Sequence, residues 1–287
     1  MRVLVIGKTG QVATELAALA PDAVCLGRDG AEMSDPEGAG VAVSRALRET
    51  GAAAAINAAA YTAVDRAEED EALADAVNGV APGAIARACA GAGIPLVHIS
   101  TDYVFDGSGS APRPPDAPTA PLGVYGRTKL AGEEAVRAAD GVHAILRTSW
   151  VFSPHGANFV KTMLRLSETR DTLSIVADQI GGPTSARAIA AACLRIAARL
   201  QEAPALSGTY HFAGAPDVSW ADFARAIFDA AGRRVAVRDI PSSDYPTPAA
   251  RPLNSRLDCR TTESAFAIAR PDWRIDLRDT LNAMGAA

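Results

Sequence analysis

Short apolar runs alternate with helical spacing over the first half of the chain. The apolar runs are too short for buried helices and are bounded by turn-forming residues, which is typical of buried strands. Such runs predict strands at Val3–Ile6, Val24–Leu26, Ala53–Ile56, Leu96–Ile99 and Ala144–Leu146. Helical spacing predicts helices at Val12–Leu19, Pro36–Glu49, Glu68–Ala90 and Tyr125–Ala138. Strand and helix in alternation favour a parallel sheet with right-handed crossovers.

The pattern becomes irregular after Trp150. Helices are predicted near Asn158–Ser167, Ala186–Leu200 and Trp220–Ala230, and strands near Leu173–Val176 and Thr209–Phe212. Asp106–Pro121 is predicted to be a surface loop, and Ser242–Ser255 to be extended. We therefore expect an α/β fold in which residues 1–150 form a doubly wound, Rossmann-like domain. Residues 151–287 are expected to form mainly a smaller α/β substrate lobe, with part of 172–200 returning to the first domain.

Composition narrows the class of protein. The 287 residues carry a formal net charge of -5, which offers no basic field to nucleic acid. No run of about 18 apolar residues is free of breakers, so no membrane span is expected. The four cysteines are isolated along the sequence, which disfavours a disulfide framework or a metal cluster. No signal-peptide pattern opens the sequence, and we expect a cytoplasmic protein.

A glycine-rich turn follows the first predicted strand. Gly7 allows a tight turn, and Gly10 lets a pyrophosphate approach the backbone at the start of the next helix. Ala13 stands at the usual third glycine position and still permits close packing of helix on strand. A turn without a ligand is the alternative. The position of the glycine segment after the first strand of an alternating pattern favours a dinucleotide-binding site.

The residues after the second and third strands bear on the choice of cofactor. The second strand ends Leu26-Gly27-Arg28-Asp29, where an arginine suits a 2′-phosphate and a carboxylate suits a ribose hydroxyl. Because Arg28 is the first of the two charged residues after the strand, we favour NADPH, with NADH as the alternative. A solvated turn that contacts neither cofactor is the remaining possibility. Ala60, Tyr61 and Thr62 fall where the chain leaves the third strand, and we expect them to contact the cofactor.

Three side chains suggest proton transfer beside that cofactor. Tyr125 and Lys129 lie one helical turn apart, and Thr101 follows the fourth predicted strand. We expect Thr101 to hold a carbonyl oxygen, Tyr125 to protonate it, and Lys129 to lower the pKa of the phenol and bind the nicotinamide ribose. A solvated helix surface is the alternative for the Tyr-Lys pair alone.

These residues together resemble the extended short-chain dehydrogenase/reductase superfamily, and nearly the whole chain takes part in the likeness. The segments that carry it are Gly7–Val12, Asn57–Asp65, Ser100–Phe105, Tyr125–Glu133, Arg147–Val151, Asn158–Leu164, Asp178–Thr184 and Tyr245–Ser255. The longer ones are similar to reductases of nucleotide-linked deoxysugars. The implied reaction is reduction of the C4 ketone of dTDP-4-dehydro-L-rhamnose by NAD(P)H to give dTDP-L-rhamnose.

The resemblance also implies site residues, position by position. It makes Thr101, Tyr125 and Lys129 catalytic, and Thr101, Asp102 and Trp150 contacts of the substrate. The cofactor contacts that it implies are Gly10, Gln11, Val12, Ala60, Tyr61 and Thr62, with Arg28, Glu32 and Met33 near the adenosine. We add Arg251 as a contact of the substrate diphosphate, because a guanidinium binds phosphate through paired hydrogen bonds. A surface salt bridge is the alternative for Arg251.

The chain departs from the family pattern at several positions. Tyr61 stands where a histidine is also common. Members have been associated with Mg²⁺ through glutamates at a dimer contact, and Glu15 could serve, but Ala186-Arg187-Ala188 supplies no carboxylate. We therefore predict no metal, and retain a homodimer as an expectation.

The alternatives are another nucleotide-sugar 4-ketoreductase, an epimerase or a 4,6-dehydratase of the same superfamily, and a non-catalytic subunit. Dehydratases of the superfamily place a glutamate acid directly after Thr-Asp, where this chain has Tyr103, which argues against elimination. An epimerase would consume no NAD(P)H. A non-catalytic regulatory subunit of the same fold is disfavoured because the Tyr-Lys pair is intact.

Overall fold

A parallel sheet forms the centre of the larger part of the molecule. The computed structural model describes residues 1–286, and within that range six strands pair in the order β10-β5-β4-β3-β1-β2, every pair parallel. These strands are β1 (Val3–Ile6), β2 (Val24–Leu26), β3 (Ala54–Asn57), β4 (Leu96–Thr101), β5 (His143–Thr148) and β10 (Gly208–His211). The predicted doubly wound, Rossmann-like sheet is confirmed.

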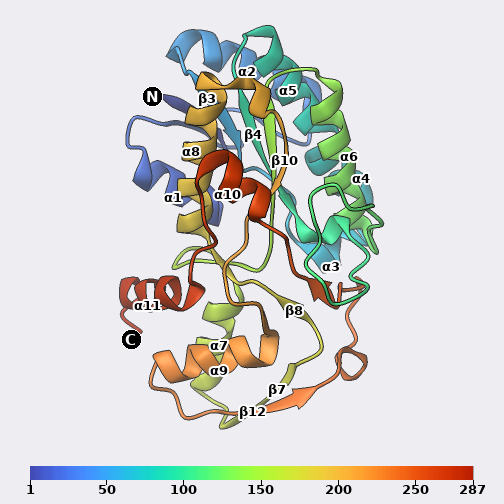
Figure 1. Cartoon of the computed structure of the whole chain (residues 1–287), viewed down its shortest axis with the longest axis vertical. Coiled ribbons are helices and arrows are strands. Elements are labelled where there is room, and N and C mark those ends of the chain that lie inside the picture. The colour runs from blue at the N-terminus through green and yellow to red at the C-terminus, as the bar shows by residue number, and fades with distance from the viewer. Residues whose placement is uncertain (287) are drawn as a thin grey trace.

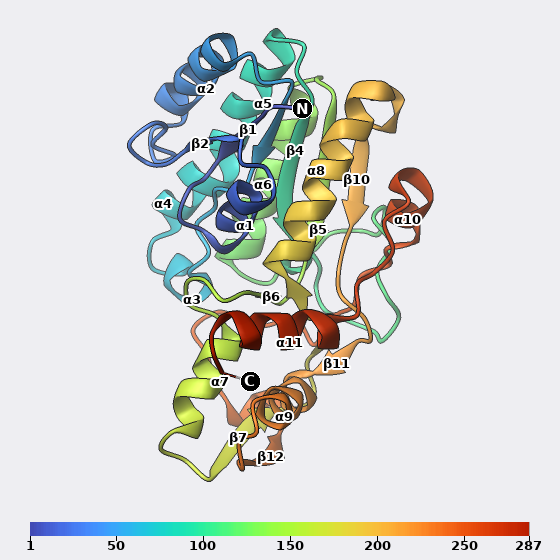
Figure 2. The ribbon, with the colours of Figure 1, turned by 90° about the vertical axis from the view of Figure 1, so that its left-hand side faces the viewer.

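Helices cover both faces of this sheet (Figure 1). One face carries α1 (Gln11–Leu19) and α8 (Ala186–Glu202), which Figure 2 turns toward the viewer. The other face carries α2 (Pro36–Thr50), α5 (Ala81–Gly91) and α6 (Val124–Ala138). Successive residues of β1 alternate between these two cores, because side chains of a strand point to opposite faces in turn. A strand buried on both sides must be apolar throughout, which is why the sequence predicts β1 correctly.

The predicted helix at Glu68–Ala90 is divided into several pieces. The chain forms α3 (Val64–Ala67), α4 (Glu71–Asp75), a π-helical segment η1 (Ala76–Val80) and then α5. The interruption falls at Gly79 and just before Pro82, as the sequence indicated. A π-helical turn widens the helix locally and often occurs at functional sites. Here it contains the buried side chain of Asn78.

A smaller lobe lies beyond the carboxyl ends of the sheet strands (Figures 1 and 2). Its core is formed by α7 (Phe159–Ser167), α9 (Trp220–Ala230) and α11 (Trp273–Ala283). Two parallel strands, β7 (Thr172–Val176) and β12 (Ala236–Ile240), pack beside α9. β12 is not predictable from the apolar pattern of the sequence, because Arg238 and Asp239 interrupt it.

Short elements connect the lobe to the sheet. A three-stranded sheet joins β11 (Val218–Ser219), β8 (Ile180–Gly181) and β13 (Asn254–Ser255), and β6 (Val151–Phe152) pairs with β9 (Thr184–Ser185). The remaining elements are α10 (Arg260–Phe266) and the 3-10 turns η2 (Asp102–Val104), η3 (Pro204–Leu206) and η4 (Ser242–Asp244). Within the described range, no helix is long and apolar enough to cross a membrane.

Candidate active site

Several of the predicted site residues meet at one edge of the sheet. Ile6 pairs with Asn57, and Thr101 pairs with Thr148, so β1, β3, β4 and β5 all end at this edge. The chain turns to β2 on one side of β1 and to β3 on the other, which makes this position a topological switch point. Ligands of open α/β sheets bind outside the carboxyl ends of the strands at such a point.

The glycine turn after β1 fits a dinucleotide pyrophosphate. Gly7 has a φ of 121°, and a Cβ on it would lie 3.3 Å from the carbonyl carbon of Ala58 and 3.4 Å from the Cβ of Ala13. Gly10 is the N-cap of α1, has no side chain to satisfy the first N–H groups, and would place a Cβ in open space. The unpaired N–H groups of a helix start, together with its positive dipole end, attract a phosphate.

Gln11 and Val12 follow that turn with different roles in packing. The amide oxygen of Gln11 accepts hydrogen bonds from Ser153 Oγ at 2.7 Å and from Asn158 Nδ2 at 2.9 Å. Val12 is half-buried against the core under α1. Gln11 therefore ties the glycine turn to the segment that leads into α7, which the sequence analysis did not anticipate.

The residues expected at the adenosine lie after β2. Arg28 and Glu32 are exposed there, and backbone and hydroxyl groups of Ser34 hold the pKa of the Glu32 carboxyl below its ordinary value. Met33 is only 7% exposed and packs in the core between the sheet, α2 and α5. The two charged side chains are thus accessible to a ligand, whereas most of Met33 is covered by the protein.

An amide on the π-helical segment fixes the backbone beyond β3. Asn78 Oδ1 accepts from the N–H of Tyr61 at 2.8 Å, and Asn78 Nδ2 donates to the carbonyl of Tyr61 at 3.0 Å. The same Nδ2 donates to Thr128 Oγ1 on α6 at 3.3 Å. Asn78 thus joins the predicted cofactor segment, which includes Ala60 and Thr62, to the helix of Tyr125. The only sequence signal for it was an amide inside an otherwise alanine-rich helix.

Thr101 and Asp102 lie at the end of β4 and are both buried. Thr101 Oγ1 donates to Asp102 Oδ1 at 3.1 Å and accepts from the N–H of Tyr103 at 3.2 Å. Burial raises the pKa of Asp102 to about 6, while the hydroxyls of Ser255 and Thr101 oppose this shift. Asp102 Oδ2 is buried without a hydrogen-bond partner among the described residues, so it can accept a further hydrogen bond.

Tyr125 lies near the start of α6, beside Thr101. Its ring meets the edge of the Tyr103 ring with centroids 5.5 Å apart. The helix approaches this closely because residue 126 is glycine: a Cβ there would overlap the carbonyl oxygen of Tyr103. Burial raises the pKa of the Tyr125 phenol above its ordinary value, the Thr101 hydroxyl opposes the rise, and the charge of Asp102 adds to it.

The expected effect of Lys129 on that phenol is not seen. Lys129 is 2% exposed, and its Nζ donates at 2.8 Å to the carbonyl oxygen of Ile99 on β4. It does not contribute to the pKa shift of Tyr125, and the phenol pKa is raised rather than lowered. The one-turn spacing placed Lys129 on the expected side of α6, but its ammonium is bound to the backbone of the sheet.

Burial lowers the pKa of Lys129 to about 8, while Glu133 opposes the shift. Because the folded-state pKa lies below the unfolded one, charged Lys129 reduces stability below pH 8, and the penalty fades as the pH rises toward 10.5. The penalty is about 3 kcal/mol.

We predict that Lys129→Met loses most activity yet gains stability over the wild type at pH 7, and that this gain shrinks by pH 10. Urea unfolding at pH 7 and pH 10 measures the difference in free energy of unfolding between variant and wild type. A difference that is the same at both pH values would contradict the prediction.

Trp150 contacts the small lobe, whereas Arg251 contacts α3 and Tyr103. Trp150 has a φ of 49° and stacks on Trp220 of the lobe, with ring centroids 3.5 Å apart. Arg251 pairs with Asp65 of α3 at 2.7 Å, and its Nη1 lies 3.5 Å from the Tyr103 hydroxyl. The salt bridge that is the alternative for Arg251 is therefore present. The Arg251 side chain also reaches Tyr103, whose ring contacts Tyr125.

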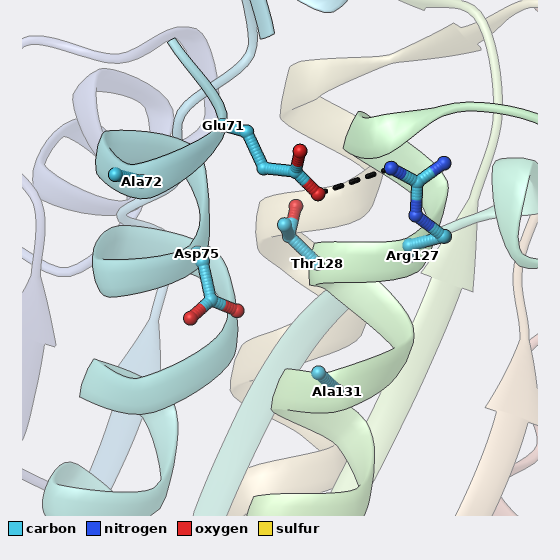
Figure 3. A pocket seen from close by; sticks show the side chains of 6 residues that line it. All are labelled: Glu71, Ala72, Asp75, Arg127, Thr128 and Ala131. Atoms are coloured by element: carbon cyan, nitrogen blue, oxygen red, sulfur yellow. Dashed lines mark hydrogen bonds and ion pairs between the residues drawn. The ribbon is translucent and has the colours of Figure 1, made fainter. Parts of the chain in front are cut away.

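A surface pocket of 610 Å³ lies between α4 and α6 (Figure 3). Glu71 and Asp75 of α4 face Arg127 and Thr128 of α6, and Arg127 pairs with Glu71 at 3.1 Å. Thr101, Tyr125 and Lys129 are not among the residues that line this pocket, and Lys129 extends from α6 toward β4 instead.

Glu15 has cationic and imidazole partners rather than other carboxylates. Its two oxygens lie 3.1 Å from His155 Nε2 and 3.4 Å from Arg187 Nη1. Over residues 1–286 there is no group of three or more histidine, cysteine or carboxylate side chains that could hold a metal ion. The donor set around Glu15 does not fit Mg²⁺, which requires oxygen ligands.

Comparison with known proteins places the chain among deoxysugar reductases. The family described as RmlD substrate binding domain matches residues 1–286. A dTDP-4-dehydrorhamnose reductase of Sinorhizobium fredii is 45% identical, over 97% of this chain and 96% of the relative.

Solved structures agree. A dTDP-4-dehydrorhamnose reductase from Clostridium acetobutylicum superposes with a TM-score of 0.90 at 32% identity, covering 99% of this chain and 100% of the other. The Bacillus anthracis enzyme, in complex with NADP, superposes with a TM-score of 0.89 at 32% identity, covering 98% and 99%.

Proposed function

The chain belongs to the dTDP-4-dehydrorhamnose reductase family, and from this membership we propose that it reduces the C4 ketone of dTDP-4-dehydro-L-rhamnose with NAD(P)H, giving dTDP-L-rhamnose. One observation carries the proposal: Thr101 and Tyr125 lie side by side at the sheet edge where the glycine turn can hold a pyrophosphate. A proton donor and a carbonyl-binding hydroxyl are thereby placed next to a dinucleotide site.

The nicotinamide, when bound, supplies the hydride that adds to C4 of the sugar. The hydroxyl of Thr101, which donates to Asp102 Oδ1 in the structure, turns its one proton to the ketone oxygen and so favours the developing negative charge. Tyr125 keeps its proton at neutral pH because burial raises the pKa of its phenol, and it transfers that proton to the alkoxide as the hydride arrives. The reaction then leaves a hydroxyl at C4 and a phenolate that recovers its proton from solvent.

Elimination is disfavoured by the side chain after Asp102. Tyr103 occupies the position of the dehydratase glutamate, and burial raises the pKa of its phenol to about 12, against the opposing charge of Arg251. Its ring packs against Tyr125 and its hydroxyl faces Arg251. A phenol of this kind is a much weaker acid than a glutamate, so the arrangement favours reduction.

The direct test is an absorbance assay of NADPH and NADH oxidation with dTDP-4-dehydro-L-rhamnose as substrate. We expect loss of reduced cofactor equal to the amount of dTDP-L-rhamnose formed, which chromatography of the sugar nucleotides measures. Epimerisation would change the sugar without net consumption of NAD(P)H. Absence of turnover would sink the substrate assignment.

Arg28 is expected to favour NADPH over NADH. It is exposed after β2, where its guanidinium can pair with a 2′-phosphate that NADH lacks. We predict that Arg28→Ala raises the KM for NADPH about tenfold, since a hydrogen bond to a charged group contributes about 1.5–3 kcal/mol, and changes the KM for NADH little. Arg45→Ala, an exposed arginine of α2, serves as the control. Equal effects on both cofactors would reject this role.

Further expectations belong to the same proposal. Residues 1–150 would hold the cofactor with α8 packed on the sheet. Residues 151–287, including Arg251, would supply most contacts to the dTDP-sugar, and Trp150, the last residue of the first range, would add one. The protein would work in the cytoplasm as a homodimer, which light scattering of the purified chain tests.

A further inference from the structure

Trp150 has a backbone conformation that requires support. It follows β5 with a φ of 49°, in the left-handed region that disfavours residues other than glycine. Such a conformation persists only where surrounding contacts hold it, and it is often found at functional sites. Within the range that the structure describes, Asp140 and Ala267 are the other non-glycine residues with positive φ.

The contacts that hold Trp150 come from the small lobe. Its indole stacks on Trp220 with centroids 3.5 Å apart and planes 8° from parallel. Gly181 of β8 leaves room for the ring, because a Cβ there would lie 2.8 Å from Trp150 Cε2. The carbonyl of Trp150 accepts from the N–H of Thr184 at 3.2 Å. The stack is therefore the main side-chain contact that opposes rotation of the ring.

Trp220 is itself fixed from a different direction. It is the first residue of α9, and its Nε1 donates to Gln179 Oε1 at 3.2 Å. Gln179 Nε2 in turn donates to Ser242 Oγ at 2.9 Å, and the ring of Phe159 lies 4.5 Å from that of Trp220. Trp220 is thus a rigid part of the lobe against which Trp150 rests.

The stacked pair borders the candidate active site. Thr148, two residues before Trp150, pairs with Thr101. A Cβ on Gly181 would lie 2.8 Å from the Trp150 ring and 3.0 Å from the Cβ of Ser255, whose hydroxyl acts on Asp102. Trp150 is therefore separated from the Asp102 carboxyl by little more than Gly181 and Ser255.

We infer that Trp220 is a positioning residue for the sugar nucleotide: its indole holds Trp150 in the strained conformation that presents that residue to the substrate. This inference rests on the proposed reductase function and adds to it a residue that does not itself touch the substrate. Dispersion between the two overlapping ring faces, together with their removal from water, supplies the force.

Kinetics separate positioning from general stability. We expect Trp220→Leu, which keeps an apolar side chain but cannot stack, to raise the KM for dTDP-4-dehydro-L-rhamnose about tenfold, while the KM for NADPH stays within about twofold. Trp220→Phe should recover most of the loss. Trp273→Phe is the matched control, because that indole packs on Phe223 at 5.3 Å and not on Trp150. Equal increases in both KM values, or no change, would overturn the inference.

Circular dichroism tests the stack independently of catalysis. The chain has three tryptophans, and two indoles give an exciton couplet only when they lie close together and their transition dipoles are not parallel. We expect an exciton couplet in the wild type that Trp150→Phe and Trp220→Phe both remove and Trp273→Phe keeps. A couplet that persists in Trp220→Phe, or one that Trp273→Phe removes, would overturn the stack and the inference.

The outcomes distinguish this inference from the proposed function. Wild-type protein that shows the couplet but does not turn over the substrate would remove the proposed function, and with it this role of Trp220. Active wild type with unchanged kinetics in Trp220→Leu would remove only the role of Trp220.

Discussion

Replacing Tyr125 with phenylalanine should lower kcat with dTDP-4-dehydro-L-rhamnose by about 10²-fold or more, the usual contribution of a positioned general acid. The variant lacks only the phenol oxygen, so the ring contact with Tyr103 remains and the fold is preserved. Without that oxygen, the alkoxide must take its proton from water. Single-turnover oxidation of NADPH measures the effect on the chemical step.

Binding of NADPH should be nearly unchanged in Tyr125→Phe, which fluorescence titration checks. Tyr210→Phe is the matched control, since Tyr210 lies on β10 at the edge of the sheet and donates its hydroxyl proton to the carbonyl of Leu206. Full activity in Tyr125→Phe would exclude Tyr125 as the proton donor, whatever the substrate proves to be.

Glu133→Gln should reduce the free energy of unfolding by about 3–5 kcal/mol, the cost of leaving one member of a buried ion pair unpaired. Glu133 is fully buried and accepts from Arg147 Nε at 2.8 Å and Nη2 at 2.7 Å, and from Ser100 Oγ at 2.6 Å. Glutamine has nearly the same shape but no charge, so Arg147, itself 2% exposed, keeps an uncompensated charge. Urea denaturation at pH 7 gives the difference.

The pH dependence provides an internal check on this prediction. Burial alone would raise the pKa of Glu133, but Arg147, Ser100 and Arg137 outweigh it and hold the pKa below its ordinary value. A lowered carboxyl pKa stabilises the fold above the unfolded-state pKa, and this stabilisation is lost as the pH falls through the folded-state pKa. The gap between wild type and variant should therefore shrink in acid. Glu134→Gln, at the exposed next position, should change stability by less than about 0.5 kcal/mol.

The parallel strands were predictable because each is covered by helices on both faces. β1 occurs at its predicted bounds, since a strand buried on two sides must be apolar without interruption. The half-buried edge strand β2 does so too, because it contains no charged residue. β12 carries Arg238 and Asp239, which interrupt its apolar pattern, and was missed for that reason. Sequence periodicity therefore predicts the central sheet much better than the lobe.

The candidate site was predictable only in part. Thr101 and Tyr125 lie together because one follows a strand and the other starts the next helix, and both facts are local. The direction of Lys129 depends on the carbonyl of Ile99, and the partners of Gln11 lie beyond residue 150. Such contacts join segments that are distant in the sequence, so helical spacing cannot predict them.

The bonding of Asn78 also affects the chemical lifetime of the protein. Asn78 is followed by Gly79, a dipeptide in which the glycine nitrogen readily attacks the side-chain carbonyl and expels ammonia. In the fold, that carbonyl accepts the N–H of Tyr61, and the helical backbone keeps the two reacting atoms from aligning. Deamidation would place a carboxylate against the carbonyl of Tyr61, where Asn78 now donates a proton. Each unfolding event therefore exposes this position to irreversible ageing, and mutations that destabilise the fold should also shorten the active life of the protein in storage.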